Sequence, residues 1–371
     1  MKNRVIISVS NDLSTDQRVK KQCASLQSDG YAVTLLGREL KNSLPISRPY
    51  RVRRFKLWFN TGALFYAALN VRLFFYLLFH RADIYYANDL DTLPANFLAA
   101  KFRNAYLIYD SHEFFTEVPE IQNRPIVKKT WKFFERFTIE RADVVITVND
   151  SIAGLLAKAY NLTDVVVVQN LPEAVPQISK KDRNKIAKSH ERICILQGSG
   201  INVDRGAEEL VDAFQNVENA VLLIVGDGDA LPGLKKRVAR LGLTNRVIFK
   251  PKMPYADMMS YTALADVGFS LDKASNVNYK FSLPNKIFDY AYAGVPVLAT
   301  DLVEVRKIIE TYKFGRVVSN LEPTTLAREI NGFLNDKASL KAYRQNTADV
   351  VKNLNWQSQF NTVLKRMKDL G

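Results

Sequence analysis

The stretch that decides the fold of this chain is Ser282-Leu283-Pro284-Asn285-Lys286-Ile287-Phe288-Asp289-Tyr290, which continues to Ala293-Gly294-Val295-Pro296-Val297. It predicts a short helix with both ends marked. Ser282 is a suitable N-cap, and Pro284 in the first turn loses nothing by lacking an N–H group. Gly294 can adopt the left-handed cap, and Pro296 prevents the helix from continuing. Any helix of an α/β sheet can carry these marks, so the stretch alone is also compatible with a purely structural role.

The same stretch places polar side chains where a phosphorylated ligand can bind. Asn285 and Asp289 are four residues apart and share one face of the helix. The free N–H groups of the first turn form an anion site, with the cation Lys286 beside them. An acid one turn deeper suits a diol, so we expect phosphates at the mouth of the helix and a ribose behind them.

The composition bounds the class of protein. A chain of 371 residues has room for about two domains, and 47% hydrophobic and 24% charged residues are ordinary for a folded soluble protein. The two cysteines and three histidines give neither a metal-binding spacing nor a disulfide framework. The opening Met1–Ser10 predicts a first strand, not a secretory signal. We therefore expect a cytoplasmic protein without a metal or other cofactor.

Positive charge is concentrated near the start of the chain. The net charge is +14, and residues 1–82 carry 14 Lys and Arg against 4 Asp and Glu. This block suits an anionic membrane surface, and it also suits nucleic acid. It contains no recognised nucleic-acid motif, so we expect no nucleic-acid partner.

An apolar run from Leu57 to His80 follows the cations of residues 51–56. It predicts either a helix packed on a sheet beside a solvated basic strand, or a peripheral contact with an anionic membrane through residues 48–80. A span across the membrane is the least favoured alternative, because Asn60, Asn70 and Arg72 interrupt the run. A cytoplasmic protein that is peripheral on the inner face of the cell membrane fits this pattern.

Short β-rich runs alternate with helical patterns along the whole chain, which predicts parallel sheets covered on both faces. We expect the strands Val5–Val9, Ala32–Leu36, Asp83–Ala87, Tyr106–Asp110, Asp143–Thr147, Asp164–Val168, Ile193–Gln197, Val221–Val225, Arg246–Phe249, Asp266–Ser270 and Val295–Ala299. The fold class is therefore α/β, with two doubly wound Rossmann-like domains.

The domain boundary is visible in the composition. Pro172-Glu173-Ala174-Val175-Pro176 and the polar, basic stretch from Ser179 to Arg192 predict a linker. We expect one domain over residues 1–175, a second over 190–353, and a C-terminal helix over 354–371 that crosses back to the first domain.

Loops after the first two strands of the second domain are the other candidates for ligand binding. Gly198-Ser199-Gly200 lets the backbone approach a ligand, and Arg205 can clamp a diphosphate. Gly226-Asp227-Gly228 follows the next strand, and Ile248 lies on apolar backbone that can cover a base. Ligands of open α/β sheets bind beyond the carboxyl ends of the strands, so these loops point to the same edge as the opening stretch. A solvated Arg205 in a surface loop is the structural alternative.

Taken together, these motifs resemble the retaining glycosyltransferases of family 4, with the GT-B architecture of two Rossmann-like domains and a cleft between them. In the second domain the resemblance rests on Gly198…Arg205-Gly206, Gly226-Asp227-Gly228, Arg246–Phe249 and Leu283-Pro284-Asn285-Lys286…Asp289…Ala293–Val297. In the first domain it rests on Asp16-Gln17-Arg18-Val19, Asn88-Asp89, Asp110-Ser111-His112-Glu113 and Val168-Gln169-Asn170. It covers nearly the whole chain.

The resemblance implies a nucleotide-sugar donor, UDP- or GDP-linked, bound by the second domain, and a lipid-linked or saccharide acceptor bound by the first. His112, Arg205 and Lys286 would be the catalytic residues, with Arg205 on the diphosphate and His112 on the donor sugar. The implied donor-binding residues are Gly198, Ser199, Gly200, Gly226, Asp227, Ile248, Asn278, Leu283, Pro284, Asn285 and Asp289. The implied acceptor-side residues are Asp16, Arg18, Asn88, Asp89 and Glu113. The implied reaction is hexosyl transfer with retention, by same-face attack, in the synthesis of cell-surface polysaccharide.

Three departures from the family pattern stand out. Phe281 occupies the position of the earlier acid, eight residues before Asp289, and Asn278 nearby can replace one sugar contact. Ser199 stands where a basic residue is expected six residues before Arg205. The glycine-rich loop after the first strand is replaced by Ser10–Ser14.

The residues leave several alternatives open. Asp89-Leu90-Asp91 matches the Asp-x-Asp pattern of a metal-binding motif, but it lies in the acceptor domain. There it predicts a pair of acids at a helix N-terminus or a contact with the acceptor. His112 can instead be a buried histidine bonded to backbone, and Glu113 faces away from it if the segment is extended. The rival functions are a nucleotide-sugar epimerase of the same architecture and a binding protein without turnover.

Overall fold

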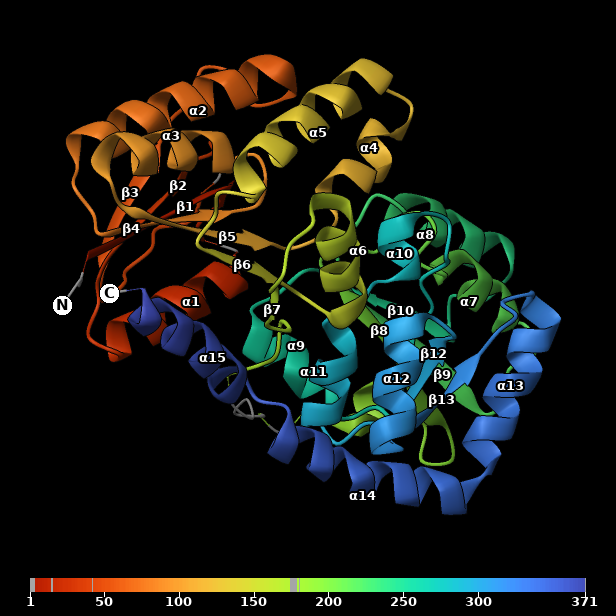
Figure 1. Ribbon diagram of the computed structural model, residues 1–371. Helices are drawn as coiled ribbons and strands as arrows, with labels where there is room; N and C mark the ends of the chain where they lie inside the picture. Colours follow the sequence, from red (N-terminus) through yellow and green to blue (C-terminus); the bar gives the residue numbers. More distant parts are fainter. Residues whose placement is uncertain (1–3, 15, 42, 174–178, 180, 371) are drawn as a thin grey trace. The chain divides into compact units, whose positions relative to one another are not determined.

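The computed structural model describes residues 4–14, 16–41, 43–173, 179 and 181–370 (Figure 1). The chain forms two compact units, here called unit 1 (Met1–Asn170 with Trp356–Gly371) and unit 2 (Leu171–Asn355). The predicted strand at Met1–Ser10 is described from Arg4 onward. Residues 174–176 of the predicted linker lie outside the described residues.

Unit 1 is built on a parallel seven-stranded sheet in the order β3-β2-β1-β4-β5-β6-β7. The strands are β1 (Arg4–Asp12), β2 (Ala32–Arg38), β3 (Arg51–Phe55), β4 (Ile84–Asn88), β5 (Tyr106–Ser111), β6 (Val144–Thr147) and β7 (Val166–Val167). The basic segment after residue 50 is thus the edge strand β3, which pairs with β2 from Arg51 to Phe55. An edge position suits it, because alternate side chains of β3 face solvent.

Helices cover both faces of this sheet (Figure 1). The helices of unit 1 are α1 (Gln17–Ser28), α2 (Gly62–Phe79), α3 (Leu93–Arg103), α4 (Pro119–Gln122), α5 (Pro125–Ile139), α6 (Asp150–Tyr160) and α15 (Trp356–Asp369), with a 3₁₀ turn at Phe115–Glu117. Figure 1 shows α2, α3 and α5 on one face and α1 with α15 on the other. Helix α15 follows unit 2 in the sequence but packs here, where the Trp356 indole N–H donates to Ser25 Oγ at 2.9 Å.

Helix α2 is long and apolar enough to cross a membrane by length and composition alone. One of its faces packs on unit 1 through Phe65, Leu69, Leu73 and Leu77, but only 22% of the helix is buried. It is therefore neither a fully buried core helix nor a helix without partners.

Unit 2 contains a parallel six-stranded sheet in the order β10-β9-β8-β11-β12-β13. The strands are β8 (Arg192–Gly198), β9 (Ala220–Gly226), β10 (Val247–Lys250), β11 (Val267–Ser270), β12 (Val297–Thr300) and β13 (Gly315–Val318). The helices are α7 (Ala207–Ala213), α8 (Leu231–Arg240), α9 (Tyr255–Thr262), α10 (Val277–Lys280), α11 (Lys286–Tyr292), α12 (Val303–Tyr312), α13 (Pro323–Asn335) and α14 (Lys337–Asn353). Both sheets reverse strand order beside their first strand, which is the topology whose carboxyl edge binds ligands.

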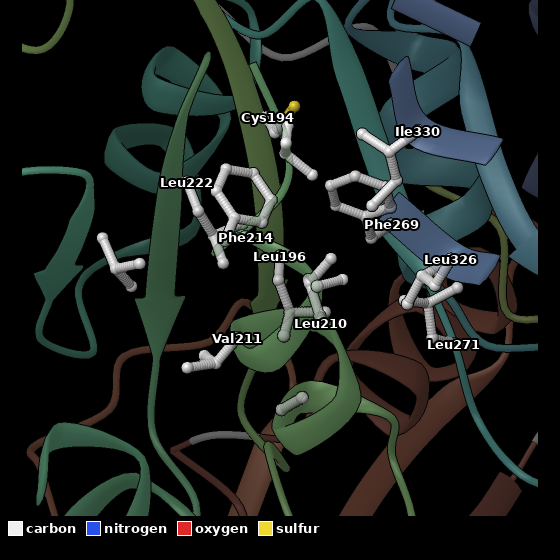
Figure 2. Packing of buried hydrophobic residues seen from close by; sticks show 14 of the residues in the cluster. Cys194, Leu196, Leu210, Val211, Phe214, Leu222, Phe269, Leu271, Leu326 and Ile330 are labelled. Atoms are coloured by element: carbon white, nitrogen blue, oxygen red, sulfur yellow. The ribbon is translucent and has the colours of Figure 1, made fainter. Parts of the chain in front are cut away.

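The core of unit 2 explains why these runs form strands and helices. Figure 2 shows buried side chains from β8, β9, β11, α7 and α13 that point toward one another. They include Leu196, Phe214, Leu222, Phe269 and Ile330. Strands buried on both faces need continuous apolar sequence, and β9 (Ala220–Gly226) is buried along its whole length.

This unit corrects one sequence prediction and adds one strand that the sequence did not predict. The stretch from Ser179 to Arg192 is not a free linker, because its described part packs on unit 2. Arg183 donates to Leu264 O at 3.0 Å and pairs with Asp266 at 3.1 Å, and Arg192 reaches the same carboxylate at 3.0 Å. Strand β13 was not predicted, since Arg316 interrupts the short apolar run of Gly315–Val318.

Candidate functional site

In unit 2, the loops that follow β8 and β9 are joined to each other by backbone hydrogen bonds. Asp227 N–H donates to Gly198 O at 3.1 Å, and Ile201 N–H donates to Asp227 O at 2.9 Å. Gly226 has φ +139°, and a Cβ built there would lie 1.8 Å from Gly198 O. Only glycine fits at this position, so the two predicted loops form one backbone floor at the carboxyl edge of the sheet.

Arg205 lies at the start of α7, beyond this floor, and is not the solvated arginine of the structural alternative. Its Nη1 lies 3.0 Å from Oδ1 of Asp272, a fully buried carboxylate two residues after the end of β11. Its guanidinium lies 4.2 Å from the ring centroid of Tyr279. Asp272 Oδ2 and Arg205 Nε are both buried without a hydrogen-bond partner among the described residues. Such orphaned polar atoms are uncommon, and they mark a polar site that a ligand can complete.

The helix predicted from Ser282 begins later than expected. Helix α11 starts at Lys286, with Asn285 before it and no side-chain cap, while the Ser282 hydroxyl donates to Tyr279 O at 2.9 Å. The prediction of Ser282 as N-cap and of Pro284 in the first turn is wrong, because a separate short helix, α10, occupies residues 277–280 and holds Ser282. The prediction for Gly294 is confirmed: it follows the helix with φ +71°.

Lys286 is half-buried in this arrangement, within range of the charges of Arg205, Asp272 and Asp289. Burial lowers the pKa of the Lys286 ammonium; Asp272 and Asp289 oppose this, while Arg205 adds to it. Arg205 thus pairs directly with Asp272, while Lys286 feels the charges of Arg205 and of the two carboxylates Asp272 and Asp289.

Asp289 is held by two neighbours on the other side of the same helix. The Tyr255 hydroxyl donates to Asp289 Oδ1 at 2.7 Å, and Gln197 Nε2 donates to Oδ2 at 3.3 Å. Gln197 is fixed in turn by the Thr262 hydroxyl, which donates to its Oε1 at 2.5 Å. Burial and the Asp289 charge raise the pKa of Tyr255, so its hydroxyl stays a donor. The carboxylate is thus pre-oriented by two side-chain donors.

The remaining predicted donor residues lie around this cluster. Ile248 is half-buried on the edge strand β10, opposite Leu223 of β9. Asn278 is buried on α10, and Phe281, in the place of the family acid, is half-buried directly after that helix. Ser199 and Gly200 lie in the loop after β8, and Leu283 lies in the segment between α10 and α11.

The second group of predicted residues lies in unit 1, at the carboxyl ends of β4 and β5. His112 Nδ1 lies 3.0 Å from Asp89 Oδ2, and the His112 backbone N–H donates to Asp89 Oδ1 at 3.0 Å. Its Nε2 lies 3.3 Å from Asn88 Oδ1. The ring is therefore bonded to side chains rather than to backbone, and it is 20% exposed.

The protonated form of His112 is favoured. Burial alone would lower its pKa, but Asp89, by charge and hydrogen bond, and Asp110 outweigh burial and raise the pKa of His112 to about 9. Asp89 has the positive φ of +61°, which turns its side chain back toward β5 and His112. At neutral pH this group is a cation and a hydrogen-bond donor.

Arg18 and Asp110 form the buried support of this histidine. Arg18 donates to Asp110 through Nε at 3.2 Å and Nη2 at 2.9 Å, and through Nη1 to Val168 O at 2.8 Å. Gln22 and Tyr86 also donate to Asp110. Arg18 is only 4% exposed, so the prediction that it contacts an acceptor is corrected: it positions Asp110, which lies 3.9 Å from His112 Nε2.

Three other predicted residues have local roles. Asp16 is the N-cap of α1 and accepts from Val19 N–H at 3.0 Å, while Glu113 is exposed after β5. Asp89 is not part of a helix N-terminal acid pair, because α3 begins at Leu93. Burial and the Asp89 charge raise the pKa of Asp91 to about 7. Among the described residues, no group of three or more His, Cys, Asp or Glu side chains is arranged to hold a metal ion.

Sequence analysis missed Asp272, Tyr279, Tyr255 and Gln197. Asp272 carried a usable signal, since an acid two residues after a buried strand lies at the carboxyl edge. The tyrosines carried none, because aromatic residues are common in cores.

Family models match both units of the chain. The model described as glycosyl transferases group 1 matches residues 178–350, and that described as glycosyltransferase family 4 matches residues 17–171. Together they cover most of the chain, and each lies almost wholly within one unit.

Two curated relatives are chitobiosyldiphosphodolichol beta-mannosyltransferases from yeasts. The Candida albicans protein is 24% identical over 71% of this chain and 62% of its own length. The Yarrowia lipolytica protein is 22% identical over 85% of this chain and 76% of its own length. The chain thus spans less than two thirds of the first of these relatives.

Solved structures share the fold over the whole chain. Sucrose-phosphate synthase from Thermosynechococcus elongatus has a TM-score of 0.82 at 16% identity, covering 100% of this chain and 99% of that one. Anabaena Alr3699/HepE in complex with UDP and glucose has a TM-score of 0.74 at 17% identity, over 99% and 100%. WaaG, a glycosyltransferase involved in lipopolysaccharide biosynthesis, has a TM-score of 0.69 at 15% identity, over 97% and 98%. The predicted class of two Rossmann-like domains of GT-B type is confirmed.

Proposed function

Because the chain belongs to the glycosyltransferases of family 4 type, we propose that it transfers a hexosyl group from a UDP- or GDP-sugar to a lipid-linked or saccharide acceptor in the synthesis of cell-surface polysaccharide. The observation that carries this proposal is the unit 2 site, where Arg205 pairs with the buried Asp272 and Lys286 lies within range of both charges. Asp289 lies on the same helix as Lys286 and is held in place by Tyr255.

The arrangement suits a nucleoside diphosphate. Two cations can bind the diphosphate and stabilise it as it leaves, and Asp289 can accept hydrogen bonds from the ribose hydroxyls. The glycine floor after β8 and β9 lets phosphate oxygens approach backbone N–H groups. We propose that these cations stabilise the leaving group without a divalent metal.

Retention is supported by the state of His112. Inversion needs a base that takes the acceptor proton, and a histidine with a pKa of about 9 is already protonated at neutral pH. His112 would instead donate to the donor sugar, and the leaving phosphate would take the acceptor proton. The curated relatives are named as beta-mannosyltransferases, so the anomer of the product is the decisive measurement.

The proposed acceptor bears on where in the cell the protein acts. The relatives' names specify a diphosphodolichol acceptor, and this supports a lipid-linked acceptor here. We place the protein at the cytoplasmic face of the cell membrane, held peripherally by the cationic and apolar segment of residues 48–80.

The test is transfer from a panel of UDP- and GDP-sugars to polyprenyl-diphosphate-linked saccharides, followed by mass spectrometry and by NMR of the new anomeric proton. We expect one donor to be consumed only when the acceptor is present, with or without a chelator, and the donor anomer to be retained. Epimerised donor without transfer would replace this proposal with the epimerase, and nucleotide binding without turnover on any acceptor would indicate a binding protein. An inverted product would overturn the retaining mechanism alone.

A further inference from the structure

Helix α2 has two apolar faces. The face opposite the buried one carries Leu64, Val71, Phe75 and Phe79, and Phe79 is 74% exposed. A helix that needs only one apolar face to pack normally carries polar residues on the other. The second face therefore needs an explanation other than folding.

Neighbouring helices carry exposed apolar side chains as well. On α3 they are Leu98 and Phe102, and on α5 they are Ile126, Phe133 and Phe137. Phe102 is 68% exposed, Ile126 80% and Phe133 66%. These side chains are spaced four or seven residues apart on each helix, that is, about one or two turns, so each helix presents a stripe.

The three helices form one layer. Ring centroids lie 6.0 Å apart for Phe74 of α2 and Phe102 of α3, 5.5 Å apart for Phe97 of α3 and Phe137 of α5, and 5.1 Å apart for Tyr66 of α2 and Trp131 of α5. Figure 1 shows all three on the same side of the unit 1 sheet. We call the exposed side chains of α2, α3 and α5 the three-helix face. Contiguous apolar surfaces of this kind mark interaction sites.

The charges of this face have one sign. Helices α2 and α3 contain no Asp or Glu, and the single acid of α5, Glu135, is fully buried. The same helices carry the cations Arg72, Lys101, Arg103, Lys129 and Arg136. They also carry Lys128 and Lys132, which pair with Glu117 of the preceding 3₁₀ turn at 2.7 and 3.2 Å. Apolar stripes interspersed with cations and free of exposed acids are complementary to an anionic lipid surface.

Helix α2 is anchored to unit 1 and cannot leave it without loss. Asn70 donates to Asp91 O at 2.8 Å, and its Oδ1 accepts from Ala95 N–H at 3.1 Å. Arg72 donates to Lys56 O at 2.9 Å and lies over the Phe55 ring. Extracting the helix would leave these groups unpaired in hydrocarbon, which costs several kcal/mol. The interactions favour a helix that lies along the membrane surface.

We propose that the three-helix face docks unit 1 on an anionic bilayer, with α2, α3 and α5 lying in the interface and their apolar stripes inserted among the lipids. This deepens the proposed function, on which it rests for the lipid-linked acceptor, and extends the membrane contact from residues 48–80 to α3 and α5. A second copy of the chain is a less suitable occupant, because pairing two such faces would bring cations against cations.

The docked orientation also has a consequence for the site. Helices α2 and α5 begin at the carboxyl edge of the unit 1 sheet, where His112 follows β5. Trp58, which is 95% exposed, Phe59 and Ile126 lie at these helix starts. Their insertion holds the edge that carries His112 against the lipid headgroups, where a lipid-linked acceptor presents its saccharide.

Trp58 provides a direct probe, because Trp131 and Trp356 are buried. With the full-length protein and vesicles of phosphatidylglycerol and phosphatidylcholine in equal parts, we expect the Trp58 emission to shift to the blue. We also expect it to be quenched by lipids brominated near the headgroup. The same vesicles should carry the protein upward in a flotation gradient. Phosphatidylcholine alone, or high salt, should weaken binding because the attraction to anionic lipid is screened.

Two triple variants separate the apolar contribution to membrane binding from the electrostatic one. Phe75→Ser, Phe102→Ser and Phe133→Ser together should abolish the Trp58 shift even at low salt. Lys101→Gln, Lys129→Gln and Arg136→Gln together should weaken binding by roughly fivefold per cation. The matched control is Lys236→Gln with Arg240→Gln on α8 of unit 2, which should float like the native protein. Circular dichroism and transfer to a short, water-soluble acceptor confirm that each variant is folded and that its site is intact.

Each outcome has a defined meaning. A protein that neither floats nor shifts Trp58 overturns the docking proposal, as does an apolar variant that binds as well as the native protein. Loss of self-association, not of flotation, in the apolar variant would assign the face to a second copy. Resistance to carbonate extraction would indicate a spanning helix and would also overturn it. Flotation without transfer to any acceptor would leave the docking proposal standing and contradict the proposed function.

Discussion

Asp89 contacts His112 through both of its carboxylate oxygens. Oδ2 lies 3.0 Å from the ring Nδ1, and Oδ1 accepts a hydrogen bond from the His112 backbone N–H at 3.0 Å. Removing the charge but not the shape, by Asp89→Asn, should lower the pKa of His112 from about 9 toward its ordinary value of 6.5. The variant should then lose kcat/KM as the pH rises through neutrality, where the native enzyme is still protonated. A pH–rate profile, supported by NMR titration of the histidine, checks this. Identical profiles would show that Asp89 does not set the protonation of His112.

The same pair makes stability depend on pH. Because folding raises the pKa of His112 from 6.5 to about 9, its contribution is complete below pH 6.5 and is lost as the pH rises through about 9. The loss amounts to at most about 3 kcal/mol. Urea unfolding of the native protein and of His112→Gln should give curves that differ most below this window and converge above it. A constant difference at all pH values would mean that the pair carries no linked proton.

Asp272 is expected to be essential to the charge balance of unit 2. Asp272→Asn leaves Arg205 and Lys286 without their buried counter-charge and should destabilise the fold by about 3 kcal/mol or more. UDP should partly restore this stability, because its diphosphate replaces the missing negative charge. Thermal unfolding with and without UDP measures both effects. A variant as stable as the native protein would show that the Arg205–Asp272 pair is not buried in solution.

Asp289 and Tyr255 should differ in importance. Asp289→Asn replaces a charged acceptor of ribose hydroxyls and should weaken UDP or GDP binding about tenfold or more. Tyr255→Phe removes only the supporting hydroxyl and should change affinity by less than about fivefold. Isothermal titration calorimetry of both variants makes the comparison. Unchanged affinity in Asp289→Asn would remove the ribose role.

Gly226 should tolerate no side chain. Gly226→Ala adds a Cβ 1.8 Å from Gly198 O at a φ of +139°, so the two joined loops must separate. We expect a loss of about 2–4 kcal/mol in unfolding free energy, together with loss of nucleotide binding. The control is Gly233→Ala in α8, where a Cβ meets nothing within 4 Å. It should stabilise the helix by about 0.5–1 kcal/mol. Equal effects of both substitutions would contradict the role of the glycine floor.

The architecture was predictable because its signals are local. Apolar runs of strand length alternate with helical patterns, and parallel sheets follow from that order. The predicted strand Tyr106–Asp110 matches β5 to within one residue, since an apolar run marks it. By contrast, Ser282 has the composition of an N-cap but is held by α10, a helix too short to give a periodic pattern.

The site was predictable only in part. Strand ends and glycines located the loops after β8 and β9, since backbone geometry leaves marks in the sequence. The pairing of charged side chains left no such mark, because the partners are far apart in the sequence. Arg18 and Asp110 are 92 residues apart, and Arg205 and Asp272 are 67 apart. The role of Arg18 therefore changed from acceptor contact to support of Asp110 once its burial was known.

The half-buried Lys286 couples the binding of a diphosphate to the uptake of a proton. Burial already lowers the pKa of this ammonium in the free protein. An arriving diphosphate would raise that pKa again, because it adds negative charge beside the ammonium. At alkaline pH, binding would then draw a proton from solution, and the measured heat would vary with the ionisation enthalpy of the buffer. Donor binding would then strengthen as the pH falls from alkaline values through the pKa of Lys286.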